Sequence, residues 1–158
     1  NQRGLNHAVE QANEWCIHNN AESVLVLPAD IPLIEYEDID KMVELGSVER
    51  NLVIAPSRNF GTNALLQKPP GLIRVSFGFH SFWKHVNEAS VKGVLVQHYS
   101  SERVAFDIDS LYDLQCFLEI ESQTMSHQFL EQIGVRNRLS NRIRLSRIPM
   151  SQIQVSGS

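Results

Sequence analysis

The sequence predicts an α/β fold in which a mainly parallel, twisted sheet carries helices on both faces. Short, continuously apolar segments alternate along the chain with longer segments whose apolar residues recur at helical spacing. Strands that read as continuous apolar runs are typical of parallel sheets covered on both sides. The 158 residues are 42% apolar and 20% charged, which suits one globular domain with a real core.

The first half of the chain supplies two helices and two strands. Apolar residues at helical spacing predict an amphipathic helix at about 5–18. Residues 23–27 form an apolar, β-branched run that is too short for a helix and therefore predicts a strand. A second helix is expected at 35–45, and Gly46 ends it. Residues 52–55 predict another buried strand, and the polar segment after it reads as a loop.

The second half continues the alternation. Residues 73–77 are expected to be extended, and a helix follows at about 82–89. Two more strands are predicted at 94–97 and 105–108. Ser110 then opens a helix, because an acidic residue three positions later completes a capping-box pattern.

Composition restricts the class of partner and the compartment. A net charge of −4 argues against a nucleic-acid binder. Cys16 and Cys116 fall on apolar helix faces without metal-ligand spacing, which indicates free thiols in a reducing cytoplasm. No apolar run approaches the roughly 20 residues of a membrane span, and no signal peptide is visible. Oligomeric state cannot be read from the sequence, and a homodimer stays open.

The C-terminal segment has a different character. Residues 134–158 contain five arginines and no acidic residue, a pattern typical of a flexible tail, with a phosphate-binding or partner-binding arm as the alternative. We therefore predict an α/β domain at 1–133 and an Arg-rich tail at 134–158.

Two acidic motifs follow predicted strands. Asp30 lies between Pro28 and Pro32, which restrict the backbone on either side of it. Asp107 and Asp109 are two residues apart, so they share a face while the chain is extended. Ligands of open α/β sheets bind beyond the carboxyl ends of the strands, and Mg²⁺ takes one or two carboxylates. These residues are therefore candidate magnesium ligands; turn and helix-cap roles are the alternative.

A third group of residues suggests an anion site. Gly61 and Gly78 allow the backbone to come close to a ligand. The amides around Thr62 and Gly78, together with the hydroxyl of Ser81 at a helix start, would bind an anionic group. Ordinary loops with Ser81 as a helix cap are the alternative.

Five motifs occur in order along the chain: GLNHA (4–8), VLPADIPL (26–33), APSRNFGTNALL (55–66), FGFHSF (77–82) and DIDSLYDL (107–114). As a set they resemble the 2-phospho-L-lactate guanylyltransferases over about residues 4–120. The resemblance implies a nucleotidyltransferase fold of the GT-A-like type. It also implies transfer of GMP from GTP to the phosphate of 2-phospho-L-lactate or phosphoenolpyruvate, with release of pyrophosphate, in deazaflavin coenzyme biosynthesis.

The same resemblance assigns roles to single residues. Asp30 and Asp109, with Asp107, would hold Mg²⁺ and carry the catalytic chemistry. Thr62, Gly78 and Ser81 match the positions that hold the carboxylate of the three-carbon acid. The substrates implied are GTP and a three-carbon phospho-acid.

This chain departs from the family pattern mildly in DIDSLYDL, where Ser110, Leu111 and Tyr112 replace Thr-Pro-Glu, and more clearly in one loop and at its start. The family carries an acidic residue and an additional glycine where this chain has Asn59, Phe60 and Gly61. Family members also begin with a strand and a basic loop for the GTP phosphates, which have no counterpart before Asn1. We therefore expect an N-terminally incomplete chain that is weakly active or inactive alone. A nucleotidyltransferase with another nucleotide or acceptor, and a non-catalytic remnant that binds a phosphorylated acid or a partner, remain the alternatives.

Overall fold

The computed structural model describes residues 4–139, which fall into two compact units. The first unit is Asn1–Asp107 and the second is Ile108–Ser158. The predicted domain of 1–133 and tail of 134–158 stay predictions, because residues 140–158 lie outside the described part of the chain.

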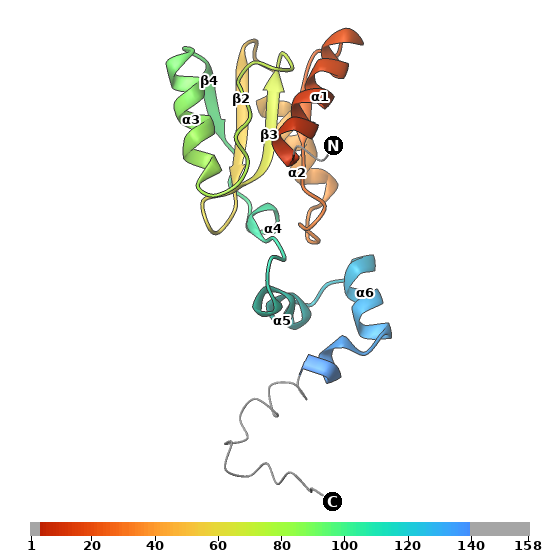
Figure 1. Cartoon of the computed structure of the whole chain (residues 1–158). Helices are drawn as coiled ribbons and strands as arrows, with labels where there is room; N and C mark the ends of the chain where they lie inside the picture. The colour runs from red at the N-terminus through yellow and green to blue at the C-terminus, as the bar shows by residue number, and fades with distance from the viewer. Residues whose placement is uncertain (1–3, 140–158) are drawn as a thin grey trace, which may run out of the picture. The chain divides into compact units, whose positions relative to one another are not determined.

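The first unit is built on a four-stranded sheet with the order β1-β3-β2-β4 (Figure 1). Its strands are β1 (Val24–Val26), β2 (Asn51–Pro56), β3 (Thr62–Lys68) and β4 (Leu95–His98). β3 pairs antiparallel with both β1 and β2, while β2 and β4 are parallel. Three of the four strands therefore run in the same direction, and β3 runs against them.

Helices cover both faces of this sheet, as predicted. The alternation of side chains along a strand sends Leu52 and Ile54 into one apolar cluster and Val53 and Ala55 into the other. The first cluster includes residues of α1 (Leu5–His18) and α3 (Ser81–Val91), and the second includes residues of α2 (Tyr36–Leu45) and α4 (Glu102–Ala105). The α/β class with helices on both faces is confirmed.

The sequence did not predict β3. Residues 62–68 read as part of a loop because three polar residues interrupt the apolar pattern, yet Thr62, Asn63 and Gln67 are all buried. The amide of Asn63 donates to the Val104 carbonyl, and the Gln67 side chain accepts from the Ile73 amide. Hydrogen bonds with backbone outside the strand thus permit a polar sequence to occupy an internal strand.

The strand predicted at 105–108 is wrong. Ser101 caps the short helix α4 by accepting a hydrogen bond from the Val104 amide at 3.4 Å, and no strand follows before residue 110. Residues 73–77 form neither helix nor strand, although side chains of α1 and α3 hold their backbone.

The second unit contains α5 (Leu111–Glu119) and α6 (Met125–Gln132). The predicted capping box at the start of α5 is confirmed: the Ser110 hydroxyl accepts from the Asp113 amide, and the Asp113 carboxylate accepts from the Ser110 amide. The ring of Phe117 on α5 meets His127 of α6 edge to face, with the centroids 5.5 Å apart. Across residues 4–139, every helix is too short or too polar to cross a membrane.

Candidate functional site

Two hydroxyl groups form the centre of the candidate site. Thr62 is the first residue of β3 and Ser81 is the first residue of α3, and both side chains are buried. The Ser81 hydroxyl donates to Thr62 Oγ1 at 3.0 Å. A β-bulge between Ala55 and Pro56 shifts the register where β2 pairs with the start of β3, and bulges of this kind re-aim side chains at the end of a ladder.

A buried histidine completes this group. His85 lies one helical turn after Ser81, so both side chains project from the same face of α3. Its Nδ1 lies 3.1 Å from Thr62 Oγ1, and its Nε2 accepts a hydrogen bond from the Ser76 amide at 2.8 Å. Burial, with a smaller contribution from the charge of Lys84, lowers the pKa of His85 to about 4. The imidazole is therefore neutral near pH 7.

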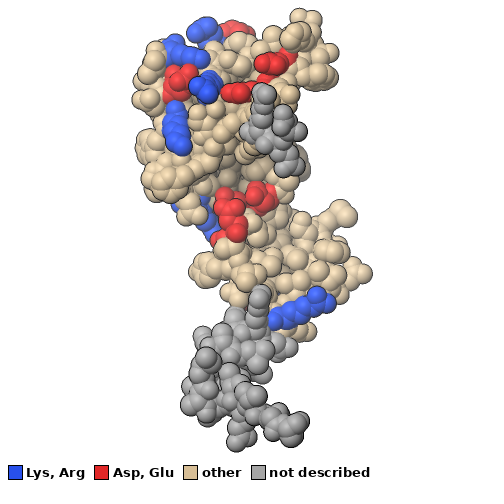
Figure 2. Space-filling view, viewed as in Figure 1, with Lys and Arg blue, Asp and Glu red and all other residues tan. Residues whose placement is uncertain are grey.

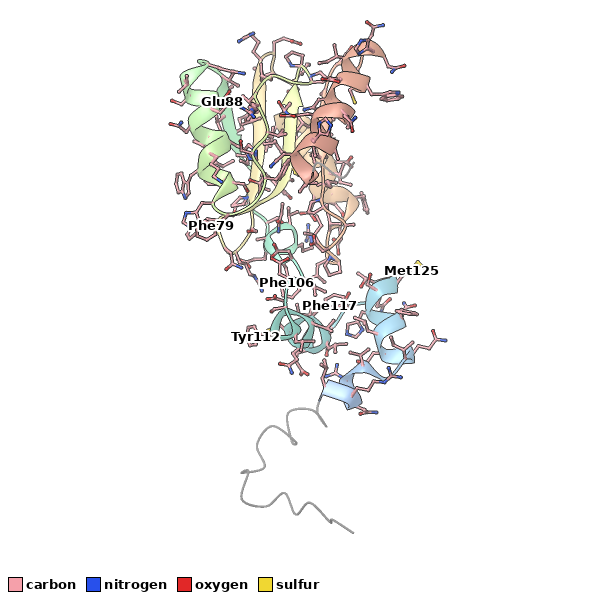
Figure 3. All side chains as sticks on the ribbon, in the orientation of Figure 1. Phe79, Glu88, Phe106, Tyr112, Phe117 and Met125 are labelled. Carbon is pink, nitrogen blue, oxygen red and sulfur yellow. The ribbon has the colours of Figure 1, made fainter. Side chains whose placement is uncertain are left out.

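The turn before α3 places the backbone of Gly78 beside Ser81. Gly78 has a φ of +119°, a conformation that residues with a side chain rarely adopt, and its carbonyl accepts from the Ser81 amide at 3.0 Å. A Cβ built on Gly78 would meet no atom within 4 Å, so the space above this backbone is open. The neighbouring Phe79 lies on the outside of the unit at the beginning of α3 and is 83% exposed (Figure 3).

The side chain of Asn6 fixes the segment that leads into this turn. Its amide group donates to the Phe77 carbonyl at 3.2 Å and accepts from the Phe77 amide at 2.6 Å. The side chain thus forms the paired hydrogen bonds that a neighbouring strand would form. Asn6 on α1 and His85 on α3 together hold Ser76 and Phe77, and the position of Gly78 follows from them.

The loop after β2 is held by a second small network. The Ser57 hydroxyl accepts from the Gly61 amide at 2.9 Å. A Cβ on Gly61 would lie 2.8 Å from that hydroxyl oxygen, so any other residue here would displace the Ser57 hydroxyl. The Phe60 carbonyl accepts from the Phe82 amide at 3.3 Å, which ties the loop to the first turn of α3.

The three predicted magnesium ligands are divided between the two units, with Asp30 and Asp107 in the first and Asp109 in the second. Asp30 is exposed in the loop after β1, and its carboxylate has no hydrogen bond or ion pair with the residues described. Asp107 is half-buried at the end of the first unit, and Asp109 lies exposed in the second unit, before Ser110. Among residues 4–139, no three His, Cys, Asp or Glu residues cluster as metal ligands do. The magnesium site stays a prediction.

A cavity of about 610 Å³ opens beside residues 74–77. Arg74 and Lys84 contribute positive charge to its wall and Glu10 contributes negative charge, and Arg74 Nε lies 3.8 Å from Glu10 Oε1. Basic and acidic side chains are also interspersed on the part of this unit that Figure 2 displays. This mixture gives the cavity no clear preference for an anion, so the hydroxyl group of Thr62 and Ser81 remains the candidate site.

The structure therefore brings Thr62, Gly78 and Ser81 together, and their role as an anion site stays a prediction. It adds Asn6 and His85, which sequence reasoning missed. The signal for His85 was its four-residue spacing from Ser81 on a helix. Donor groups of this kind suit a carboxylate or phosphate oxygen, because hydroxyl groups and free backbone amides donate to anions.

Comparison with known proteins shows which family this chain resembles. The family model described as "Guanylyl transferase CofC like" matches residues 1–151. A phosphoenolpyruvate guanylyltransferase from Rubrobacter xylanophilus is 42% identical over 112 residues, covering 70% of this chain and 55% of that protein. A 2-phospho-L-lactate guanylyltransferase from Methanocaldococcus vulcanius is 37% identical over 135 residues, covering 85% of this chain and 59% of that protein.

A third relative and one solved structure complete the comparison. A 3-phospho-D-glycerate guanylyltransferase from Colwellia psychrerythraea is 31% identical over 119 residues, covering 75% of this chain and 57% of that protein. The chain thus spans little more than half the length of these relatives. A crystal structure described as a nucleotide-diphospho-sugar transferase from Desulfovibrio desulfuricans G20 aligns with a TM-score of 0.67 at 16% identity, covering 89% of this chain and 64% of that one. This likeness confirms the predicted GT-A-like fold.

Proposed function

Because the chain belongs to the family of CofC-like guanylyl transferases, we propose that its protein transfers GMP from GTP to the phosphate of 2-phospho-L-lactate or phosphoenolpyruvate and releases pyrophosphate. The observation that carries this proposal is the buried hydroxyl pair of Thr62 and Ser81 beside the turn at Gly78. Membership of the family also supports a role in deazaflavin coenzyme biosynthesis. The free thiols of Cys16 and Cys116 favour the cytoplasm as its compartment.

The reaction joins two anionic groups. A phosphate oxygen of the acid attacks the α-phosphorus of GTP, the bond from that phosphorus to the bridging oxygen breaks, and pyrophosphate leaves with the electron pair. The acceptor phosphate is itself the nucleophile, so the protein contributes position and charge. In this proposal the hydroxyls of Thr62 and Ser81 and the backbone at Gly78 hold the carboxylate of the acid, which orients its phosphate.

Magnesium fits the carboxylates that the sequence singles out. Asp30 is exposed and offers both oxygens, since no described residue pairs with it, and carboxylate oxygens are the ligands that Mg²⁺ prefers. Asp30 and Asp109, with Asp107, would hold the ion. When bound, it would supply positive charge beside the reacting phosphates.

The relatives leave the acceptor open among three acids, because 2-phospho-L-lactate, phosphoenolpyruvate and 3-phospho-D-glycerate each appear in a relative's name. All three carry a carboxylate and a phosphate. The loop of Asn59, Phe60 and Gly61 is a candidate for selecting among them, since its contact with the amide of Phe82 places it beside Ser81.

The test is release of pyrophosphate by the protein expressed from its complete reading frame. GTP and magnesium are supplied with each acid in turn, and ATP replaces GTP in a parallel series. We expect release that requires GTP, one of the acids and magnesium, and that is lost in Asp30→Asn while the circular dichroism spectrum is kept. Release with ATP alone would favour another nucleotide, and no release from the folded protein would favour a binding remnant.

A further inference from the structure

The hydrogen bonds of His85 determine which of its ring nitrogens carries the proton. A backbone amide can only donate, so the bond from the Ser76 amide requires a free lone pair on Nε2. A neutral imidazole has one N–H, which must then lie on Nδ1. Nδ1 is 3.1 Å from Thr62 Oγ1, so His85 donates a hydrogen bond to the Thr62 hydroxyl.

This arrangement saturates the acceptor capacity of Thr62. A hydroxyl oxygen has two lone pairs and one proton. Thr62 Oγ1 accepts from His85 Nδ1 and from the Ser81 hydroxyl at 3.0 Å, which occupies both lone pairs. The proton of Thr62 is then left to donate outside this trio.

A group that can only donate selects its ligand by charge. An anionic oxygen accepts the remaining proton, whereas a hydroxyl or ammonium group that needs an acceptor finds none on Thr62. Thr62, Ser81 and His85 are all nearly or fully buried, and a hydrogen bond to a charged group is stronger where water is excluded. The same tautomer prevents His85 from taking a proton from Thr62, so neither hydroxyl is activated by it as a nucleophile.

We propose that His85 is a positioning residue that keeps the Thr62 hydroxyl of the Thr62–Ser81 pair as a donor toward the carboxylate of the phospho-acid. This inference rests on the proposed function for the identity of the ligand, and on the contacts of His85 for the arrangement itself. His85 also links the two segments that form the site. It contacts Ser76, which precedes the turn at Gly78, and Thr62, which begins β3.

Two substitutions separate the two contacts. The side-chain amide of His85→Asn reaches the position of Nδ1 and can donate to Thr62, but it leaves the Ser76 amide without an acceptor. The longer side chain of His85→Gln reaches the position of Nε2 and can accept from Ser76, but it leaves Thr62 without the donor. His18→Gln, at an exposed histidine on α1, is the matched control.

Steady-state kinetics on the complete protein give the first readout. We expect His85→Gln to raise KM for the acid about tenfold, since the lost donor acts on a bond to a charged group. KM for GTP should stay unchanged, and His85→Asn and His18→Gln should keep KM for the acid near that of the wild type. Equal KM values in the Gln and Asn variants, or a parallel rise in KM for GTP, would overturn the proposal.

A spectrum without substrate gives the second readout. In a long-range ¹H–¹⁵N correlation of the histidine-labelled protein, the signals absent from His85→Gln belong to His85. We expect a protonated Nδ1 and an unprotonated Nε2, and a protonated Nε2 would overturn the proposal. A wild-type protein without acid-dependent turnover would instead refute the proposed function, while the spectrum would still decide the arrangement of hydrogen bonds.

Discussion

At the scale of single residues, the hydroxyl of Ser81 is the group whose role can be isolated best. It is buried at the first position of α3, and its only described side-chain partner is Thr62. The helix does not depend on it as a cap, because its hydroxyl accepts no backbone hydrogen bond in the described structure and the N-cap position is His80. Removing the hydroxyl should therefore affect ligand binding more than folding.

We predict that Ser81→Ala raises KM for the acid about tenfold. The Ser81 hydroxyl fixes the Thr62 donor that faces the charged carboxylate, and a hydrogen bond to a charged group contributes roughly 1.5–3 kcal/mol. The melting temperature should change little. Steady-state kinetics with the acid varied at saturating GTP measure the effect, and Ser90→Ala, on the exposed side of the same helix, is the control. An unchanged KM would mean that Ser81 only packs at the start of α3.

The residues of the site differ in how far the sequence could predict them. Thr62, Gly78 and Ser81 were predicted because hydroxyls and glycines in loops that follow strands are typical of anion sites. Asn6 and His85 were not assigned a role. Each acts on backbone that arrives from elsewhere in the chain, and 71 residues separate Asn6 from Phe77. Spacing in the sequence cannot indicate which amide a buried side chain will meet.

At the scale of elements, one buried carboxylate ties α2 to residues 99–103, the segment that follows β4. Asp38 accepts from the Glu35 amide as part of the capping box at the start of α2. It also accepts from the Tyr99 hydroxyl at 2.7 Å, the Ser101 hydroxyl at 2.8 Å and the guanidinium of Arg103 at 2.8 and 3.0 Å. Burial disfavours its charge, but the hydrogen bonds of Arg103, Tyr99, the Glu35 amide and Ser101 outweigh burial and hold the pKa of Asp38 well below its usual range.

Replacing this carboxylate should destabilise the first unit. We predict that Asp38→Asn lowers the free energy of unfolding by roughly 3 kcal/mol, because it removes a fully buried charge that accepts hydrogen bonds from Tyr99, Ser101 and the half-buried Arg103. Urea unfolding at pH 7 measures this loss. Asp40→Asn, at an exposed position of the same helix, should change the free energy by less than about 0.5 kcal/mol.

The same variant predicts a pH dependence. The pKa of Asp38 is lower in the folded state than its ordinary value of 3.8. The ionised carboxylate therefore contributes fully to the free energy of unfolding above pH 3.8, and this contribution is lost as the pH falls toward the folded pKa. The difference in the free energy of unfolding between the wild type and Asp38→Asn should therefore shrink below about pH 4. A difference that stays constant down to about pH 2, or no difference at pH 7, would contradict this role of Asp38.

Elements with apolar periodicity were predictable and elements with polar interiors were not. The helices at 5–18 and 35–45 and the strand at 52–55 appear close to their predicted bounds, because their apolar residues recur at helical spacing or form a continuous run. The strand β3 was missed because Asn63 and Gln67 form hydrogen bonds with the backbone of Val104 and Ile73, which lie outside the strand. A pattern of hydrophobic residues carries no information about such partners.

At the scale of the whole molecule, the α/β class follows from the alternation of apolar runs and amphipathic helices, but the direction of one strand does not. Because β3 runs antiparallel between β1 and β2, the hydroxyl of Thr62 at its start meets α3 near the end of β2. If β3 ran in the opposite direction, Thr62 would lie at the other end of the strand, away from the start of α3. The reversal of β3 is therefore what assembles the site.

The central claim is that the complete protein joins GMP to the phosphate of a three-carbon acid, and the identity of the product tests it most directly. The measurement is ³¹P NMR of a reaction with GTP, magnesium and each acid. The account predicts two new, mutually coupled phosphorus resonances of equal intensity from a diphosphate that links the acid to guanosine, together with pyrophosphate. Hydrolysis of GTP with the phosphorus resonance of every acid unchanged would contradict it.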